Sequence, residues 1–289
     1  MRTPRTYLAI LVGLLALTAC RAAGQERARA VEMTTLTYVE GSGADPVKHR
    51  LDLFRPQGAS DAPVLLYFHG GVWQRGDKDQ YRNIGEAFAR RGILTAVVNY
   101  RLTPTVRHPG HAQDAARAVA WVMREAAAYG GRADQVYLSG HSAGGHLITL
   151  LLFDARYLKA EGIDAETLAG VVPLSGVFDL TKPIDDTPEG GFTAHVHPPF
   201  GTDRRVLEIA SPIRHLHPTR VPLLVILAGD DYKDMQRQSQ MFIGALQEKK
   251  IPATFETILG KGHFPLVQSI GREGDPTTDL IADFVLKSR

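Results

Sequence analysis

The sequence has only one cysteine, Cys20, among its 289 residues, so it can form no internal disulfide and no multi-cysteine metal site. It also lacks an excess of charge. Its 33 basic and 31 acidic side chains give a formal net charge of +2, which is no reason to expect a nucleic-acid partner. With 44% hydrophobic and 22% charged residues, the chain has the composition of an ordinary globular domain and can bury a sizeable core.

The apolar run of residues 8–16 is shorter than the about 20 residues that a membrane-spanning helix needs. Arg2 and Arg5 precede it, and small residues follow it. This order is typical of a secretory signal. The run ends at Cys20, after one aliphatic and two small residues, and so resembles the lipobox of bacterial lipoproteins.

This resemblance implies that Cys20 is lipidated and becomes the mature N-terminus. We therefore expect a signal peptide over residues 1–19, a tether over residues 20–32 and one catalytic domain over residues 33–289. The protein would be exported and anchored to a membrane, and Arg21 in place of Asp after the cysteine favours the outer membrane. The alternative is an ordinary signal peptide that is cut nearby.

Beyond the tether, short apolar runs alternate with segments of helical periodicity. Strands are predicted over residues 34–38, 50–54, 64–68, 93–100, 135–138, 170–174, 223–228 and 254–259. Helices are predicted over residues 80–90, 111–129, 143–153, 236–248 and 277–286. This alternation predicts an α/β fold with a mostly parallel, doubly wound sheet, helices on both faces and an antiparallel edge made by the first two strands. Residues 181–207, rich in Pro, Gly and Asp, interrupt the rhythm and predict an irregular, lid-like insertion.

The segment Gly140-His141-Ser142-Ala143-Gly144 fits the pattern Gly-x-Ser-x-Gly. A predicted strand precedes it and a predicted helix follows it, which is the context of a nucleophile elbow. Glycines on either side of Ser142 allow a tight turn. The N–H of Ala143, at the start of the helix, would face a developing oxyanion. The alternative is a tight turn with a solvated serine.

The segment His69-Gly70-Gly71-Val72-Trp73 directly follows the predicted strand 64–68. Paired glycines let backbone N–H groups approach a substrate oxygen, and a loop in this place supplies the second oxyanion donor of α/β hydrolases. We expect His69 to brace its loop by hydrogen bonds. Trp73 is interpreted as a packing residue that could also form a wall of the substrate pocket.

Together these two motifs resemble those of ester and formamide hydrolases of the α/β-hydrolase superfamily. The kynurenine-formamidase-like, hormone-sensitive-lipase-like and feruloyl/acetyl-esterase-like enzymes share them. The likeness continues through Gly76-Asp77-Lys78, Tyr100-Arg101-Leu102, Asp114, Ser175-Gly176 and Gly262-His263-Phe264. It implies that the N–H groups of Gly71, Val72 and Ala143 are the oxyanion donors.

The resemblance also places the general base at His263, in a loop after the predicted strand 254–259. The acid should follow the strand 223–228, where Asp230 and Asp231 are the candidates and Asp234 is more distant. The family pattern selects Asp231. Asp114 precedes the nucleophile, which is the wrong order along the chain, and is interpreted as structural.

The expected function is hydrolysis of short-chain acyl or aryl esters through a Ser-His-Asp triad and an acyl-enzyme, with no metal and no organic cofactor. One alternative is a kynurenine-formamidase-like amide hydrolase. Another, of a different class, is a lipid-anchored binding module on an inactive hydrolase scaffold.

Overall fold

The computed structural model describes residues 30–182 and 191–287. The predicted signal peptide, the lipidation site Cys20 and most of the tether lie outside the described residues. Within the described part of the chain, no helix has both the length and the apolar character needed to cross a bilayer.

The elements follow one another in the order that the hydrophobic patterns predict. The strands are β1 Val31–Thr37, β2 Arg50–Pro56, β3 Ala62–Phe68, β4 Leu94–Val98, β5 Gly131–His141, β6 Gly170–Leu174, β7 Leu224–Ala228 and β8 Thr254–Ile258. The α-helices are α1 Arg82–Arg90, α2 Gly110–Glu125, α3 Ala143–Phe153, α4 Arg156–Ala160, α5 Gly191–Phe200, α6 Arg204–Ile209, α7 Lys233–Glu248, α8 Pro265–Gln268 and α9 Pro276–Lys287. Short 3₁₀ helices are η1 Lys78–Tyr81, η2 Ala126–Tyr129, η3 Ala165–Thr167 and η4 Pro212–His215.

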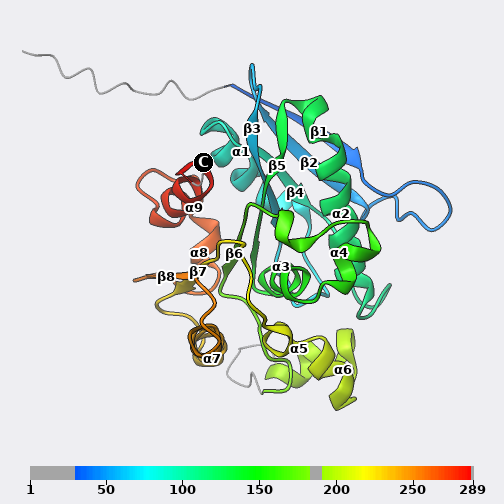
Figure 1. The fold of residues 1–289 in the computed structure, drawn as a ribbon, viewed down its shortest axis with the longest axis vertical. Helices are drawn as coiled ribbons and strands as arrows, with labels where there is room; N and C mark the ends of the chain where they lie inside the picture. The colour runs from blue at the N-terminus through cyan, green and yellow to red at the C-terminus, as the bar shows by residue number, and fades with distance from the viewer. Residues whose placement is uncertain (1–29, 183–190, 288–289) are drawn as a thin grey trace, which may run out of the picture.

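The strands form an 8-stranded sheet in the order β1-β2-β4-β3-β5-β6-β7-β8. Neighbours from β4 to β8 pair in parallel. The pairs β1–β2 and β2–β4 are antiparallel, which confirms the predicted antiparallel edge. With helices on both sides of this sheet (Figure 1), the predicted α/β-hydrolase architecture is confirmed.

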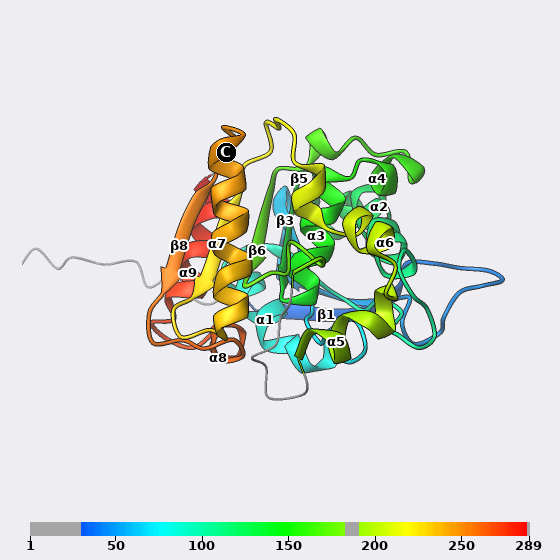
Figure 2. The same ribbon diagram turned by 90° about the horizontal axis from the view of Figure 1, so that it is seen from below.

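The two faces of the sheet carry two separate hydrophobic cores. Successive side chains of a strand point to opposite faces, so Leu66 and Phe68 of β3 join one core while Leu65 and Tyr67 join the other. The first core is closed by α2, α3 and α7, and the second by α1, α8 and α9, as Figures 1 and 2 show. Burial on both faces explains why β3 is an uninterrupted apolar run.

Two predicted boundaries are wrong. The tether does not extend to residue 32, because Val31 and Glu32 pair with β2 as the start of β1. Residues 181–207 are not irregular throughout, because α5 and the start of α6 lie within them. Val196 and Phe200, one helical turn apart in α5, are 1% and 5% exposed, so tertiary burial stabilises a helix that its prolines argued against. In Figure 1, α5 and α6 both lie outside the sheet.

Candidate active site

Ser142 lies between β5 and α3, as the nucleophile-elbow motif predicts. Its backbone is strained, with φ 54° and ψ −115°, a region that non-glycine residues rarely adopt. The Ser142 N–H donates to the carbonyl of Leu174 over 2.9 Å, which fixes the turn against β6. A Cβ on Gly144 would lie 2.0 Å from the carbonyl oxygen of Phe68, so this close approach requires glycine.

Asp231 and His263 come from the loops that follow β7 and β8. Oδ1 of Asp231 lies 2.9 Å from Nδ1 of His263, and both side chains are buried. The competing Asp230 is exposed, and its N–H donates to the carbonyl of Lys261. Asp234 forms an ion pair with Arg237 instead. Among these three carboxylates, Asp231 is the one that meets the histidine.

Ser142 and His263 line the same cavity, whose volume is about 260 Å³. Gly70, Gly71 and Val72 line it as well, while Ala143 begins α3 directly beside the serine. The remaining lining residues are Trp73, Arg75, Gly76, Gln80, Tyr81, His141, Val177, His195, Val196, Tyr232, Met235 and Phe264. The fold therefore brings together residues that the sequence analysis named separately, and their catalytic roles stay predictions.

Residues 70–77, here called the oxyanion loop, fold back tightly on themselves. The N–H groups of Gln74 and Arg75 both donate to the carbonyl of Gly71 over 3.0 Å. Val72 and Trp73 have positive φ angles of 50° and 57°. A β-branched residue such as Val is a genuine outlier there. The loop thus holds backbone strain that its surroundings must stabilise.

His69 braces the start of the oxyanion loop, as predicted. Its ring stacks between Tyr100, at 4.6 Å between centroids, and Tyr81, at 5.8 Å. Its Nδ1 lies 2.7 Å from the carbonyl oxygen of Gly70, a hydrogen bond in which the nitrogen must be the donor. Complete burial lowers the pKa of His69 to about 4 against the opposing effect of this bond. The ring is therefore neutral near pH 7.

Trp73 fits both interpretations, since it is 2% exposed and still lines the cavity. Its indole N–H donates to Nδ1 of His146 over 3.3 Å. Because Nδ1 accepts, the proton of this neutral ring is on Nε2, which donates to the carbonyl of Ala210 over 2.8 Å. Burial lowers the pKa of His146 to about 3. His146 thus links α3, the oxyanion loop and the segment after α6.

His141 has a closer relation to the site than the packing role that its position predicted. Its buried ring lies 4.4 Å from that of His263, centroid to centroid. Burial first, and then the neighbouring His263, hold the pKa of His141 well below its ordinary value. The His141 ring is therefore neutral near pH 7.

Sequence reasoning missed several lining residues. Tyr81 comes from η1, and Tyr232 and Met235 lie at the start of α7. Tyr232 follows Asp231 directly, and that adjacency was the one available signal. His215 and His217, which precede the predicted acid Asp231 in the sequence, are not among the residues that line this cavity.

Asp114 is structural, as predicted from its place before the nucleophile. Its fully buried carboxylate lies 2.7 Å from Nη2 of Arg101 and 3.1 Å from Nε2 of His49. It thus ties α2 to the chain segment after β4. In residues 30–182 and 191–287, no group of three or more His, Cys, Asp and Glu side chains could hold a metal ion.

The chain is similar to known proteins over most of its length. The BD-FAE family model matches residues 51–246. The chain is 28% identical to a kynurenine formamidase of Danio rerio over 273 residues, which cover 92% of this chain and 86% of that protein. It is also 28% identical to the esterase LipQ of Mycobacterium tuberculosis over 273 residues, spanning 91% of this chain and 64% of that protein.

Among solved structures, esterase B of Lactobacillus rhamnosis superposes with a TM-score of 0.76 at 22% identity, covering 89% of this chain and 86% of that one. This likeness shows the fold, and the family match extends over more than half of the sequence. The chain therefore belongs to the BD-FAE family, and it is an α/β hydrolase of the carboxylesterase type.

Proposed function

We propose that this protein hydrolyses short-chain acyl or aryl esters through a triad of Ser142, His263 and Asp231. Ser142 Oγ attacks the ester carbonyl carbon, and His263 Nε2 accepts the hydroxyl proton. The oxyanion accepts hydrogen bonds from the N–H groups of Gly71, Val72 and Ala143. The alcohol then leaves with the proton from His263, and water hydrolyses the acyl-enzyme with the same histidine as base.

The observation that carries this proposal is the 2.9 Å contact between Asp231 Oδ1 and His263 Nδ1. A carboxylate at Nδ1 keeps the proton on that nitrogen, so Nε2 can accept the serine proton, and it stabilises the imidazolium that follows. The aromatic side chains of Tyr81, Tyr232 and Phe264 around the cavity suit an aryl group or a short acyl chain.

The experiment is hydrolysis of p-nitrophenyl esters from acetate to dodecanoate, together with labelling by a fluorophosphonate. Ser142→Ala should abolish both, whereas the matched variant Ser139→Ala should keep both. Ser139 is a buried serine of β5 whose hydroxyl donates to the carbonyl of Val172 and which does not line the cavity. Labelling that survives in Ser142→Ala would contradict the proposed nucleophile.

A second candidate activity is cleavage of a formamide. It is favoured by the similarity to a kynurenine formamidase, which extends over 92% of this chain. The same triad chemistry serves an amide if His263 protonates the leaving amine. The ratio of kcat/KM for N-formylkynurenine to that for phenyl acetate distinguishes the two activities. A ratio well above one would make the formamide the better substrate.

We also propose that the enzyme is exported and held at a membrane by a lipid on Cys20. The support is the lipobox-like sequence before this cysteine. Metabolic labelling with a fatty-acid probe should mark the wild-type protein and not Cys20→Ser. Equal labelling of both would exclude the anchor.

A further inference from the structure

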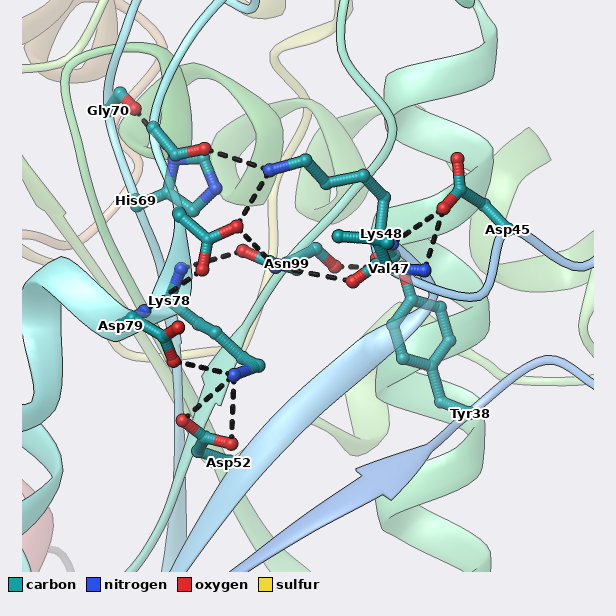
Figure 3. Close-up of polar contacts among 12 residues, drawn as sticks. Tyr38, Asp45, Val47, Lys48, Asp52, His69, Gly70, Lys78, Asp79 and Asn99 are labelled. Carbon is teal, nitrogen blue, oxygen red and sulfur yellow. Dashed lines mark hydrogen bonds and ion pairs between the residues drawn. The ribbon is translucent and has the colours of Figure 1, made fainter.

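The strained oxyanion loop is contacted by a charged side chain that does not line the active-site cavity. Lys48, in the connection between β1 and β2, reaches the end of this loop with its ammonium group. Its Nζ lies 3.0 Å from the carbonyl oxygen of Gly76 and 2.8 Å from Oδ2 of Asp77. Figure 3 marks these contacts as dashed lines from the labelled Lys48. The Lys48 side chain is 21% exposed, so the contact is partly shielded from water.

A shift of the Gly76 backbone would displace the start of the loop at Gly70, because the two residues pack closely together. Gly76 has φ 108°, and a Cβ there would lie 2.4 Å from Nδ1 of His69 and 2.7 Å from the carbonyl oxygen of Gly70. The two ends of the loop are thus in contact through their backbones. A displacement of Gly76 would therefore pass to Gly70 and to the neighbouring N–H groups of Gly71 and Val72.

Asp77 is itself held from a second side. Asn99, which is 1% exposed, donates from Nδ2 to Oδ2 of Asp77 over 3.0 Å and accepts at Oδ1 from the N–H of Lys78 over 2.7 Å. Burial raises the pKa of Asp77, but hydrogen bonds from Lys48, Asp79 N–H and Asn99 hold it below its ordinary value. Asp77 is therefore an ionised partner for Lys48 at neutral pH.

We propose that Lys48 is a positioning residue that holds the oxyanion loop in its reactive conformation through Gly76 and Asp77. Lys48 is not among the residues that line the described cavity, so it acts without touching the substrate. Its effect falls on the tetrahedral intermediate and the transition states that flank it, because the oxyanion forms there and is absent from the bound ester. This inference rests on the proposed function of the loop N–H groups.

Lys78 provides a matched control. Its Nζ lies 2.7 Å from Asp79 Oδ1 and 3.1 Å from Asp52, in an ion pair as close as that of Lys48 but directed away from the oxyanion loop (Figure 3). Lys48→Met and Lys78→Met each keep an aliphatic side chain and remove one ammonium group. The variants therefore differ in whether the lost charge held the loop.

The test measures kcat and KM for p-nitrophenyl acetate, and the affinity of an alkyl trifluoromethyl ketone, whose serine adduct carries an oxyanion. For Lys48→Met we expect kcat to fall at least about tenfold, since loss of an oxyanion donor costs roughly 100- to 1000-fold and displacement loses part of that. KM should change less than about threefold, and inhibitor affinity should fall in proportion to kcat/KM. Lys78→Met should retain kcat within about threefold, and Lys48→Arg should recover much of it.

Three results would overturn the proposal. The first is a folded Lys48→Met enzyme with kcat and inhibitor affinity within threefold of wild type. The second is an equal loss of kcat in Lys78→Met, and the third is a Lys48→Arg enzyme as impaired as Lys48→Met. If Lys48→Met does not fold, Lys48→Gln takes its place in the same measurements. Failure of the proposed function would look different, because the wild type itself would then neither hydrolyse the ester nor bind the ketone.

Discussion

The oxyanion loop is held at two places by two kinds of interaction. At Trp73 the support is neutral and deeply buried, since the indole packs among aromatic rings and donates to the uncharged His146. At Gly76 and Asp77 the support is charged and partly hydrated, through Lys48. A buried neutral contact is sensitive to lost packing and to acid, whereas a partly exposed ion pair is sensitive to salt. We therefore expect different changes to weaken the two supports of the loop: lost packing or acid at Trp73, and salt at Lys48.

The largest effect is expected from removal of the apolar support. Trp73 is 2% exposed and packs edge-on against Phe200 of α5, with 4.8 Å between ring centroids. Trp73→Ala would leave a cavity there, and truncation of a buried Trp costs about 3–5 kcal/mol. Urea unfolding measures the loss. The control is Trp121→Ala, which removes a tryptophan that is only partly buried, and an equal loss in both variants would contradict this account.

A smaller loss of stability is expected when His146 is replaced by an apolar side chain of similar size, which keeps the packing beside Trp73 and removes the hydrogen bonds. His146→Leu leaves the indole N–H of Trp73 and the carbonyl of Ala210 without their partner. Each buried unpaired group costs about 1–3 kcal/mol, so we expect a loss of about 2 kcal/mol or more. His217→Leu, at an exposed histidine, should change the free energy of unfolding by less than about 0.5 kcal/mol. A neutral result for His146→Leu would show that its two hydrogen bonds contribute nothing.

Acid should weaken the neutral support. Burial lowers the pKa of His146 to about 3, below the unfolded value of about 6.5. The unfolded chain therefore binds more protons than the folded one below pH 6.5, and the stability is complete above that pH and is lost as the pH falls towards 3. At pH 5 the loss amounts to about 2 kcal/mol for this one group. His146→Leu should accordingly show a smaller fall in Tm between pH 7 and pH 5 than wild type or His217→Leu, and parallel pH curves would refute the assignment.

The smallest effect is expected from salt at the charged support. The side chains of Lys48 and Asp77 are 21% and 31% exposed, so solvent ions screen their attraction in part. Raising NaCl from 0.05 to 1 M should cost less than about 1 kcal/mol at this pair and lower kcat slightly. Lys48→Met has no ion pair for salt to screen, so its kcat should fall less between 0.05 and 1 M NaCl than that of the wild type. Identical salt curves for the two enzymes would mean that the pair does not influence the loop.

Much of the fold could be predicted because its signals are local. The uninterrupted apolar run of β3 and the helical spacing of apolar residues in α2 both reflect burial, and both patterns can be read from neighbours within a few residues. The helix α3 was predicted with its observed bounds, since the turn at Ser142 and the start of the helix come from adjacent residues. The prediction failed at α5, because the burial of Val196 and Phe200 depends on partners elsewhere in the chain.

The active site, like the fold, has features that local sequence predicts and features that depend on distant segments of the chain. The sequence by itself determined the residue types of the elbow, the glycine-rich loop and the order Ser, Asp, His, because strained turns and proton transfer restrict which side chains can serve. The family resemblance already selected Asp231 over Asp230, and the structure places the Asp231 carboxylate 2.9 Å from His263. Only the tertiary structure decided that His146 receives the indole N–H of Trp73 and that Lys48 reaches Asp77. These contacts join segments far apart in the chain, and their geometry follows from how the sheet and helices pack rather than from any local pattern.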